Sequence, residues 1–205
     1  MSSSRGAHDE PGHLGRHQSS ERRGRRPIGP STERSLIDRA RDGDLDAFEL
    51  IVRSRMDAVY RLSLAITGEE ADARDAAQET FLRAWRSIGR LRDTDRFDAW
   101  LQRIAVNQAR MVVRTRRRRR VREIPASRLS HQPETAAPES DAARLGAALE
   151  LLTTDQRAIL ALHHLEGRSV EELGKILGIP VGTVKSRLFT ARKALDARLR
   201  ADADR

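Results

Sequence analysis

Cysteine is absent from this chain of 205 residues. Without thiols the protein can form no disulfide, no thiolate nucleophile and no cysteine-based zinc site. Long apolar runs are absent too, because no stretch approaches the roughly 18 consecutive apolar residues of a membrane-spanning helix. The N-terminus also lacks the apolar segment of a secretory signal peptide. We therefore expect a cytoplasmic protein that does not insert into a membrane.

Aromatic residues are scarce, at 3% of the chain, and they are unevenly placed. All of them except Phe189 lie between Phe48 and Trp100. Because large rings anchor hydrophobic cores, we expect one core within about residues 44–115. A second domain would have to pack mainly with Leu, Ile, Val and Ala.

Positive charge is in excess, since 39 Lys and Arg face 30 Asp and Glu, for a net charge of +9. Such an excess favours a polyanionic partner, with nucleic acid first and an anionic membrane surface second. The membrane alternative rests on the arginine run at residues 116–120. That run continues an amphipathic helix and has no flanking apolar anchors, so we rank this alternative low.

Composition divides the chain into four parts. Residues 1–35 form a basic tail with too few large apolar side chains to offset the entropy of ordering, so we expect disorder. Helical periodicity covers residues 36–118, and it returns over residues 142–200. Between them, residues 119–141 are rich in Pro, Ser and Thr, which predicts a flexible linker. The expected fold class is all-α, with two small helical domains joined by that linker.

The first domain has the pattern of successive amphipathic helices. An apolar stripe from Phe48 to Tyr60 lies on a helix that ends at Thr67 and Gly68. A second helix is predicted over residues 69–88, where acidic residues at its start suit the helix dipole. A polar loop at residues 90–95 then leads into a third helix, which runs into the arginine run.

The second domain carries the pattern of a helix-turn-helix at residues 169–195. Ser169 and Glu172 form a capping-box pattern, as Thr153 and Gln156 do earlier. Gly178 permits the left-handed backbone that ends the first helix. The second helix buries an apolar face that consists of Val184, Leu188, Ala191 and Leu195. Its opposite face is polar and basic: Thr183, Lys185, Ser186, Arg187, Phe189, Thr190 and Arg192.

A helix-turn-helix places its second helix in the DNA major groove, where Lys and Arg reach guanine edges or phosphates. An ordinary helical hairpin with a solvated basic face would produce the same spacing. The overall positive charge favours DNA binding.

Three segments, in this order, resemble the extracytoplasmic-function (ECF) branch of the sigma-70 factors. They are DAAQETFLRAW at residues 75–85, FDAWLQRIAVN at 97–107 and EGRSVEELGKILGIPVGTVKSRL at 166–188. The first two resemble region two of that family, a helical bundle, and the third resembles region four, a helix-turn-helix domain. The resemblance covers about residues 36–200.

The resemblance implies an RNA polymerase sigma factor that directs promoter recognition, DNA melting and transcription initiation, with a stress or envelope-response regulon. It implies no catalytic residue, metal or cofactor. The implied partners are promoter DNA, an anti-sigma factor and core polymerase, through the clamp of its largest subunit and the flap of its second subunit.

Residue roles follow from the resemblance and from local chemistry. The face expected to bind core polymerase consists of Asp75, Gln78, Glu79, Leu82 and Arg83. The residues expected at the minus-ten DNA share one helix face by their spacing: Arg103, Asn107, Arg110 and Arg114. Residues 90–95 stand where the family captures a flipped-out base. The minus-thirty-five residues are the seven of the polar helix-turn-helix face named above.

The sequence departs from the family at several positions. Met111 replaces an acidic residue, and Thr153 stands where a Pro often opens the first helix of region four. Gly174 replaces a frequent Ala, at a cost of up to ~1 kcal/mol of helix stability. A pair of histidines, His163 and His164, replaces an Arg-Tyr type of pair.

Two other classes of function remain as alternatives. An enzyme is disfavoured because the chain has no glycine-rich phosphate loop and no nucleophile beside a base. A metal site at His8, His13 and His17 is disfavoured because they lie in a low-complexity tail. An autonomous helix-turn-helix regulator is the stronger alternative, although such a regulator does not need the helix at residues 75–85.

Overall fold

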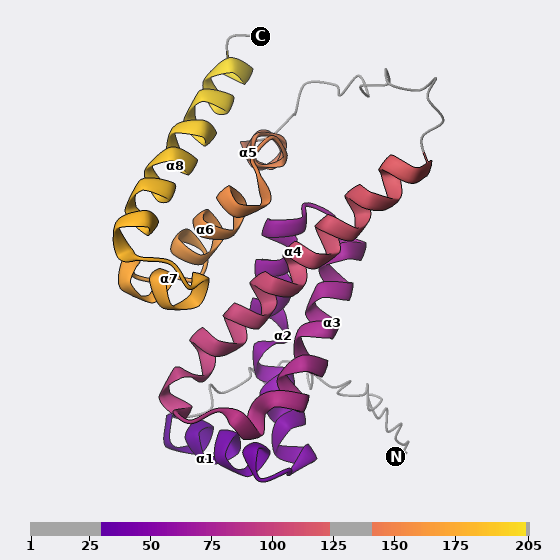
Figure 1. Ribbon diagram of the computed structural model, residues 1–205, viewed down its shortest axis with the longest axis vertical. Coiled ribbons are helices and arrows are strands. Elements are labelled where there is room, and N and C mark those ends of the chain that lie inside the picture. Colours follow the sequence, from indigo (N-terminus) through magenta and orange to yellow (C-terminus); the bar gives the residue numbers. More distant parts are fainter. Residues whose placement is uncertain (1–29, 124–140, 204–205) are drawn as a thin grey trace, which may run out of the picture.

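The computed structural model describes residues 30–123 and 141–203, and the regular elements within these ranges are all helices (Figure 1). This confirms the all-α prediction. Residues 1–29 of the expected tail and residues 124–140 of the expected linker lie outside the described residues. No helix in the described ranges is long and apolar enough to cross a membrane.

Four helices form an N-terminal bundle and four form a C-terminal unit. The N-terminal bundle consists of α1 (Pro30–Arg41), α2 (Leu45–Thr67), α3 (Glu70–Ser87) and α4 (Phe97–Glu123). Two single-turn 3-10 helices, η1 (Ile88–Arg90) and η2 (Thr94–Arg96), connect α3 to α4. The C-terminal unit consists of α5 (Asp141–Glu150), α6 (Thr154–His164), α7 (Val170–Leu177) and α8 (Val181–Ala203).

Two of the expected boundaries shift. Helix α1 begins at Pro30, so residues 30–35 are helical rather than part of a disordered tail. Proline suits the first turn of a helix, and the buried Leu36 and Ile37 hold α1 on the bundle. Helix α4 runs to Glu123, so residues 119–123 are helical rather than linker. Arginine is a good helix former, and the first proline after this run is Pro125.

Helix α2 is the centre of the N-terminal bundle and is precisely bounded by its caps. The Asp44 carboxylate accepts a hydrogen bond from the Ala47 amide at 3.0 Å, and this bond together with Arg39 lowers the pKa of Asp44. At the other end Gly68 takes a left-handed φ of 73° and donates to the Leu64 carbonyl. Helix α3 packs on both α2 and α4 and buries four alanines, whose small side chains allow close approach of neighbouring helices: Ala73, Ala76, Ala77 and Ala84.

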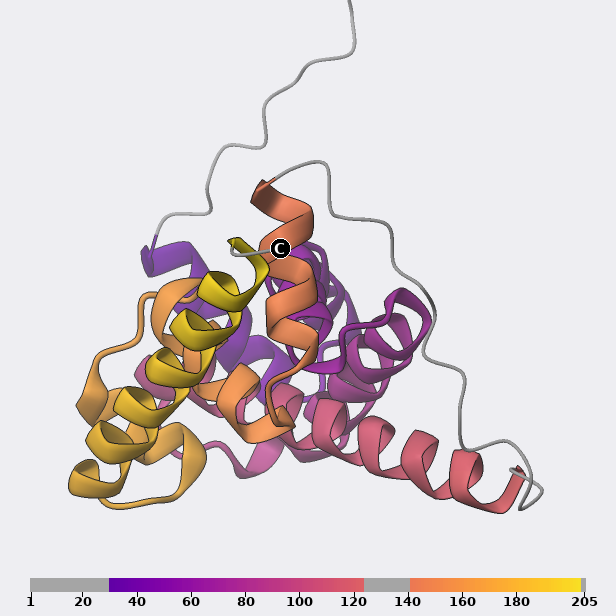
Figure 2. The same ribbon diagram turned by 90° about the horizontal axis from the view of Figure 1, so that it is seen from above.

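The C-terminal unit is built around α8, against which α5, α6 and α7 pack (Figure 2). Both capping boxes anticipated from the sequence form, at Thr153 with Gln156 and at Ser169 with Glu172. The second box lowers the pKa of Glu172. Gly178 ends α7 with a φ of 68°, as the sequence indicated.

A close backbone approach explains why residue 174 is glycine. A Cβ at this position would lie 3.1 Å from the carbonyl oxygen of Ile179 in the turn between α7 and α8. The turn folds back on α7 so closely because the Ile179 amide donates to the Gly174 carbonyl at 3.1 Å. Glycine therefore relieves a close approach where the family often has Ala.

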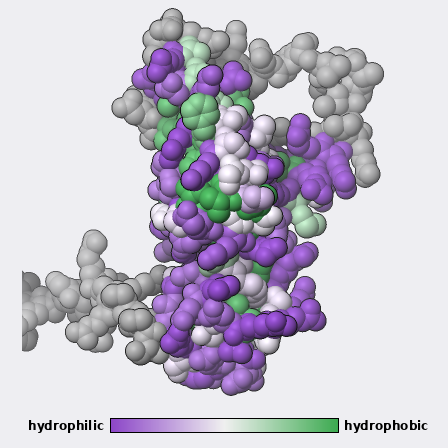
Figure 3. All heavy atoms as spheres, turned by 60° about the vertical axis from the view of Figure 1, so that its left-hand side comes forward, coloured by the Kyte–Doolittle hydropathy of each residue, from purple (hydrophilic) through white to green (hydrophobic). Residues whose placement is uncertain are grey.

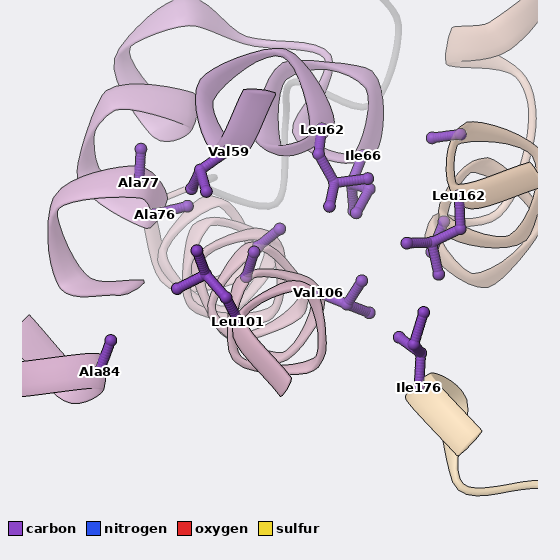
Figure 4. Close-up of a cluster of buried hydrophobic side chains, with 14 of the residues drawn as sticks. Val59, Leu62, Ile66, Ala76, Ala77, Ala84, Leu101, Val106, Leu162 and Ile176 are labelled. Atoms are coloured by element: carbon purple, nitrogen blue, oxygen red, sulfur yellow. The ribbon is translucent and has the colours of Figure 1, made fainter. Parts of the chain in front are cut away.

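The two units share one continuous hydrophobic core. Helices α6 and α7 pack on α2 and α4, and their side chains meet across the boundary (Figure 4). Ile66 and Val106 of the N-terminal bundle point toward Leu162 and Ile176 of the C-terminal unit. None of these four is more than 3% exposed. The sequence indicated two separate cores and carried no sign of this joint one.

Candidate nucleic-acid interface

The face of α3 expected to bind polymerase lies on the outside of the bundle. Asp75, Gln78, Leu82 and Arg83 are exposed and Glu79 is half-buried. Glu79 accepts a hydrogen bond from Arg83 at 2.9 Å. Leu82 is 43% exposed, so an apolar side chain sits among polar ones. The five residues form one stripe because they recur every three to four positions, opposite the buried alanines.

The minus-ten face of α4 is divided between solvent and the C-terminal unit. Asn107 and Arg114 are exposed beside α3. Arg110 is half-buried and forms an ion pair of 2.8 Å with Asp155 at the start of α6. The Arg103 guanidinium is exposed, yet it lies 3.8 Å from the position a Cβ at Gly178 would occupy.

A groove of about 870 Å³ runs between α3 and α4. Four arginines line it together with the Asn107 amide: Arg83, Arg86, Arg110 and Arg114. Because Arg83 belongs to the polymerase stripe and Arg114 to the minus-ten set, the groove connects the two expected faces. Guanidinium groups in such a groove suit a polynucleotide backbone.

The loop at residues 90–95 is more ordered than the sequence indicated. It contains the last residue of η1 and the first two residues of η2, and its own Leu91 is buried. The Asp93 carboxylate caps η2 by accepting from the Asp95 amide, and Arg34 of α1 pairs with Asp95. A cavity of about 730 Å³ opens between η2 and α1. The loop is thus a shaped, partly polar surface at the start of α4.

The exposed face of α8 carries the expected minus-thirty-five residues. Lys185, Arg187 and Arg192 are exposed, and none of them forms an ion pair with another residue in the described ranges. Phe189 is 70% exposed among these cations. The Ser186 and Thr190 hydroxyls each donate to a backbone carbonyl one turn earlier in α8, and Thr183 is half-buried.

The polar face of α8 points away from the bundle because the opposite face is buried. Val184, Leu188 and Ala191 are at most 4% exposed. The helix-turn-helix geometry expected from the sequence is therefore present, with its second helix at the outer surface of the molecule.

The two histidines of α6 contact groups within the C-terminal unit. His163 Nδ1 lies 2.8 Å from the Arg168 carbonyl oxygen, and the two imidazoles meet edge to face. Loss of hydration, with His163 and Arg192 nearby, lowers the pKa of His164. Among the described residues no three His, Asp or Glu side chains lie together as a metal would need. His8, His13 and His17 lie outside them.

Sequence reasoning missed residues that tie α4 to the C-terminal unit. Gln102 is 7% exposed, donates to Glu166 at 2.8 Å and accepts from Arg168 at 2.8 Å. Asp155 at the start of α6 pairs with Arg110 of α4 at 2.8 Å. The sequence held no signal for these contacts, which join residues more than 40 positions apart. Arg86 could have been recognised as a groove residue from its spacing, since residues three apart, such as Arg83 and Arg86, lie on the same side of a helix.

Comparison with known proteins matches both units. Residues 51–119 match the family described as Sigma-70 region 2, and residues 142–195 match Sigma-70, region 4. The RNA polymerase sigma-H factor of Pseudomonas aeruginosa is 32% identical over 184 residues, which cover 82% of this chain and 93% of that protein. The ECF RNA polymerase sigma-E factor of Haemophilus influenzae is 33% identical over 183 residues, which cover 82% of this chain and 95% of that protein. The chain belongs to the ECF branch of the sigma-70 family.

Other relatives agree with this assignment. The ECF RNA polymerase sigma factor SigE of Mycolicibacterium smegmatis is 37% identical over 157 residues, which are 74% of this chain and 61% of that protein. The chain thus spans less than two thirds of the SigE length. Among solved structures, CnrH in complex with the cytosolic domain of CnrY has a TM-score of 0.63 at 31% identity, covering 83% of this chain and 98% of CnrH.

The family resolves the main alternative. Sigma factors are DNA-binding transcription initiation factors that associate with RNA polymerase, and region 2 spans α2 to most of α4. An autonomous helix-turn-helix regulator would account for α7 and α8 but not for that region. The prediction of an ECF sigma factor is confirmed.

Proposed function

We propose that residues 36–118 of this sigma factor bind core polymerase and the minus-ten element. Residues 142–200 bind the minus-thirty-five element. Residues 119–141 then act as the connection. The observation that carries the proposal is the pair of adjacent outer faces on α3 and α4, joined by the four-arginine groove. One face suits a protein partner and the other suits a nucleic acid.

The α3 stripe of Asp75, Gln78, Glu79, Leu82 and Arg83 is the surface we assign to the clamp of the largest polymerase subunit. An exposed leucine flanked by charges and an amide suits docking against a partner helix. Helix α3 lies on the side of α4 away from α7 (Figure 1), and Asp75, Gln78, Leu82 and Arg83 are exposed on it.

Arg103, Asn107, Arg110 and Arg114 are the residues we assign to the displaced minus-ten strand. Arginine stacks on bases and pairs with phosphates, and the Asn107 amide can donate to a base edge. The ordered loop at residues 90–95 would hold the extruded base. Extrusion costs a few kcal/mol, which a shaped surface must offset.

The polar face of α8 is the element we assign to the minus-thirty-five DNA. Arg187 lies near the start of the helix, is exposed and has no ion-pair partner among the described residues. We assign it a base contact. Arg187→Ala should then cost about 1–3 kcal/mol and relax the preference at one base position. Unchanged preference across promoter variants would refute this role.

An apolar groove between α5, α6 and α8 is our candidate site for an anti-sigma factor. The groove has a volume of about 390 Å³ and is lined by leucines, among them Leu145, Leu149 and Leu195. Apolar residues gather over this half of the molecule, whereas the half built around α1 is mostly hydrophilic (Figure 3). RpoE of Bartonella quintana, with a TM-score of 0.61 at 26% identity over 76% of this chain, was solved with the anti-sigma factor NepR.

The cellular setting is part of the same proposal. Relatives named sigma-E and SigE support a stress or envelope-response regulon. Association with polymerase and nucleic acid supports a cytoplasmic protein without a catalytic residue, metal or cofactor of its own. The polymerase flap is a further expected partner of the C-terminal unit, and no described residue is assigned to it.

Paired variants test the assignment. In transcription with core polymerase, Gln78→Ala/Glu79→Ala should abolish activity by weakening core binding, measured by co-elution with core. Arg103→Ala/Asn107→Ala should spare co-elution and block promoter opening, visible as lost permanganate-reactive thymines.

Matched controls lie on the same helices. Glu70→Ala/Arg74→Ala on exposed positions of α3 and Arg119→Ala on α4 should leave both readouts unchanged. Tight, promoter-specific binding by the isolated protein, with no effect of core polymerase, would overturn the proposal.

A further inference from the structure

The groove between α5, α6 and α8 has an apolar lining that faces solvent. Its volume is about 390 Å³, and six leucines line it together with Ala65 of α2. Leu145 of α5 is 42% exposed and Leu165, directly after α6, is 60% exposed. Sites for small molecules have volumes of about 300–1,000 Å³ and are lined mainly by apolar side chains with a few polar groups. The groove therefore has the size and lining of a small-molecule site.

Two arginines and a histidine provide the polar groups of this groove. Arg157 and His164 lie on the same face of α6, seven residues apart, which is about 10 Å along the helix axis. Arg192 of α8 lies near His164 and, with the loss of hydration, lowers its pKa. The one acid among the described lining residues, Asp196, already pairs with Arg200 at 3.0 Å. The groove thus has a guanidinium toward each end and favours an anionic ligand.

Arg157 is the group that would gain most from an anion. It is 8% exposed, and its Nε has no hydrogen-bond partner in the described residues. Glu150, the acid that attracts it, is itself exposed to water. A buried polar group that lacks partners is costly, whereas an exposed one such as Arg192 is already solvated. An anionic ligand would therefore be held mainly at Arg157.

The apolar strip beside Arg157 determines the rest of the ligand. Leu160 and Ala161 lie between Arg157 and His164 on α6, while Leu145 and Leu195 extend the strip onto α5 and α8. A linear alkyl chain matches a strip of about 10 Å. A planar guanidinium in turn pairs best with a carboxylate, which accepts two parallel hydrogen bonds.

We propose that this groove binds a medium-chain fatty acid, with the carboxylate at Arg157 and the alkyl chain along the leucines. The groove is also our candidate site for an anti-sigma factor, so a bound fatty acid and such a protein would exclude each other. The binding itself does not rest on the proposed sigma function.

Calorimetric titration of the full chain tests the head group. Decanoate should bind at one equivalent, and decanol should bind about tenfold more weakly, because it has the same chain but forms no charge-assisted pair. Arg157→Met should bind the two compounds equally. Arg198→Met is the matched control, because Arg198 is exposed on α8 outside the groove, and it should keep the full preference for decanoate.

A second pair of variants tests the alkyl chain. Leu145→Gln places an amide in the groove and should weaken decanoate and decanol alike, by about fivefold. Leu151→Gln is the control, because Leu151 is 62% exposed and does not line the groove. Since both leucines are exposed, circular dichroism should show the same helical content in both variants. Affinity should also rise from hexanoate to decanoate, as the chain covers more of the strip.

Three results would contradict the proposal. Binding at many equivalents, unchanged by Arg157→Met, would mean that the compounds act only as detergents. Equal affinity of the wild-type protein for decanoate and decanol would remove the role of Arg157. Failure of the folded wild-type protein to bind decanoate would leave the groove to a protein partner. The titrations use neither polymerase nor promoter, so a failure of the proposed sigma function would not change their outcome.

Discussion

The Arg157 side chain lies between α6 and the end of α2, with 8% of its surface exposed. Its Nη1 is 3.4 Å from the position a Cβ at Gly68 would occupy, so the guanidinium covers the C-cap of α2. Its Nε is buried and donates to no described residue. Burial lowers the pKa of Arg157, and repulsion from Arg116 acts in the same direction, against attraction from Glu150. We expect Arg157→Met to stabilise the protein.

The magnitude follows from two opposing effects. A buried N–H without a partner costs about 1–3 kcal/mol. The negative end of the α2 dipole stabilises a cation at this place by about 0.3–1 kcal/mol. Methionine keeps an unbranched apolar chain that matches the arginine side chain as far as Nε, and it loses both effects. The net change should be a gain of about 1 kcal/mol in the free energy of unfolding.

Urea unfolding followed by circular dichroism measures this gain as a higher midpoint at unchanged slope. Arg198→Met is the matched control, because Arg198 is exposed on α8 and should change stability by less than about 0.5 kcal/mol. A lower midpoint for Arg157→Met than for the control would show that the buried guanidinium is a net stabilising group, and the reasoning would be wrong.

Three further outcomes test the local structure. Thr153→Ala removes the α6 capping box and should cost about 1 kcal/mol, measured by thermal unfolding; an unchanged melting temperature would contradict it. The pKa of His164 is lowered in the folded protein, so the folded state favours the neutral imidazole. The free energy of unfolding should therefore be highest above pH ~6.5, the ordinary pKa of histidine, and should decrease as the pH falls below it. An NMR titration midpoint of His164 above ~6.5 would contradict this. Gly174→Ala should gain up to ~1 kcal/mol of helix propensity, but its Cβ would lie 3.1 Å from the Ile179 carbonyl oxygen. The two effects oppose each other, so the free energy of unfolding should change by no more than about 0.5 kcal/mol. A large decrease would show that the turn between α7 and α8 cannot shift.

The sequence predicted the features that depend on residues close together in the chain, such as helix caps and helix faces. The end of α2 at Gly68, both capping boxes and the αL stop at Gly178 follow from residue chemistry within a few positions. The outer faces of α3 and α8 were predictable for a similar reason, since helical spacing alone separates their buried and exposed residues. Helix α1 was not predicted as an element of its own, because it contributes only a few apolar residues, such as the buried Leu36 and Ile37.

Contacts between distant segments were beyond those rules. The ion pair between Arg110 and Asp155 joins a residue expected at the minus-ten DNA to a residue inside the Thr153–Gln156 capping box. Nothing in the pattern of either helix indicated that one would cover the other. The location of each face was therefore predictable, while the accessibility of the α4 face was not.

The joint core also bears on why a sigma factor of this kind would need polymerase to act. Fully burying a Leu, Ile or Val side chain contributes about 1.5–3 kcal/mol, so separating Leu162 and Ile176 from α2 and α4 costs several kcal/mol. Covalent geometry does not prevent the separation, because the chain between Glu123 and Asp141 can span up to roughly 60 Å, more than one ~34 Å turn of DNA. The α3 stripe that we assign to core polymerase is largely exposed, so core binding there would not require this separation. Contacts to the separated units would then offset the cost of breaking the joint core, and only the holoenzyme would present all of α4 to the melted strand.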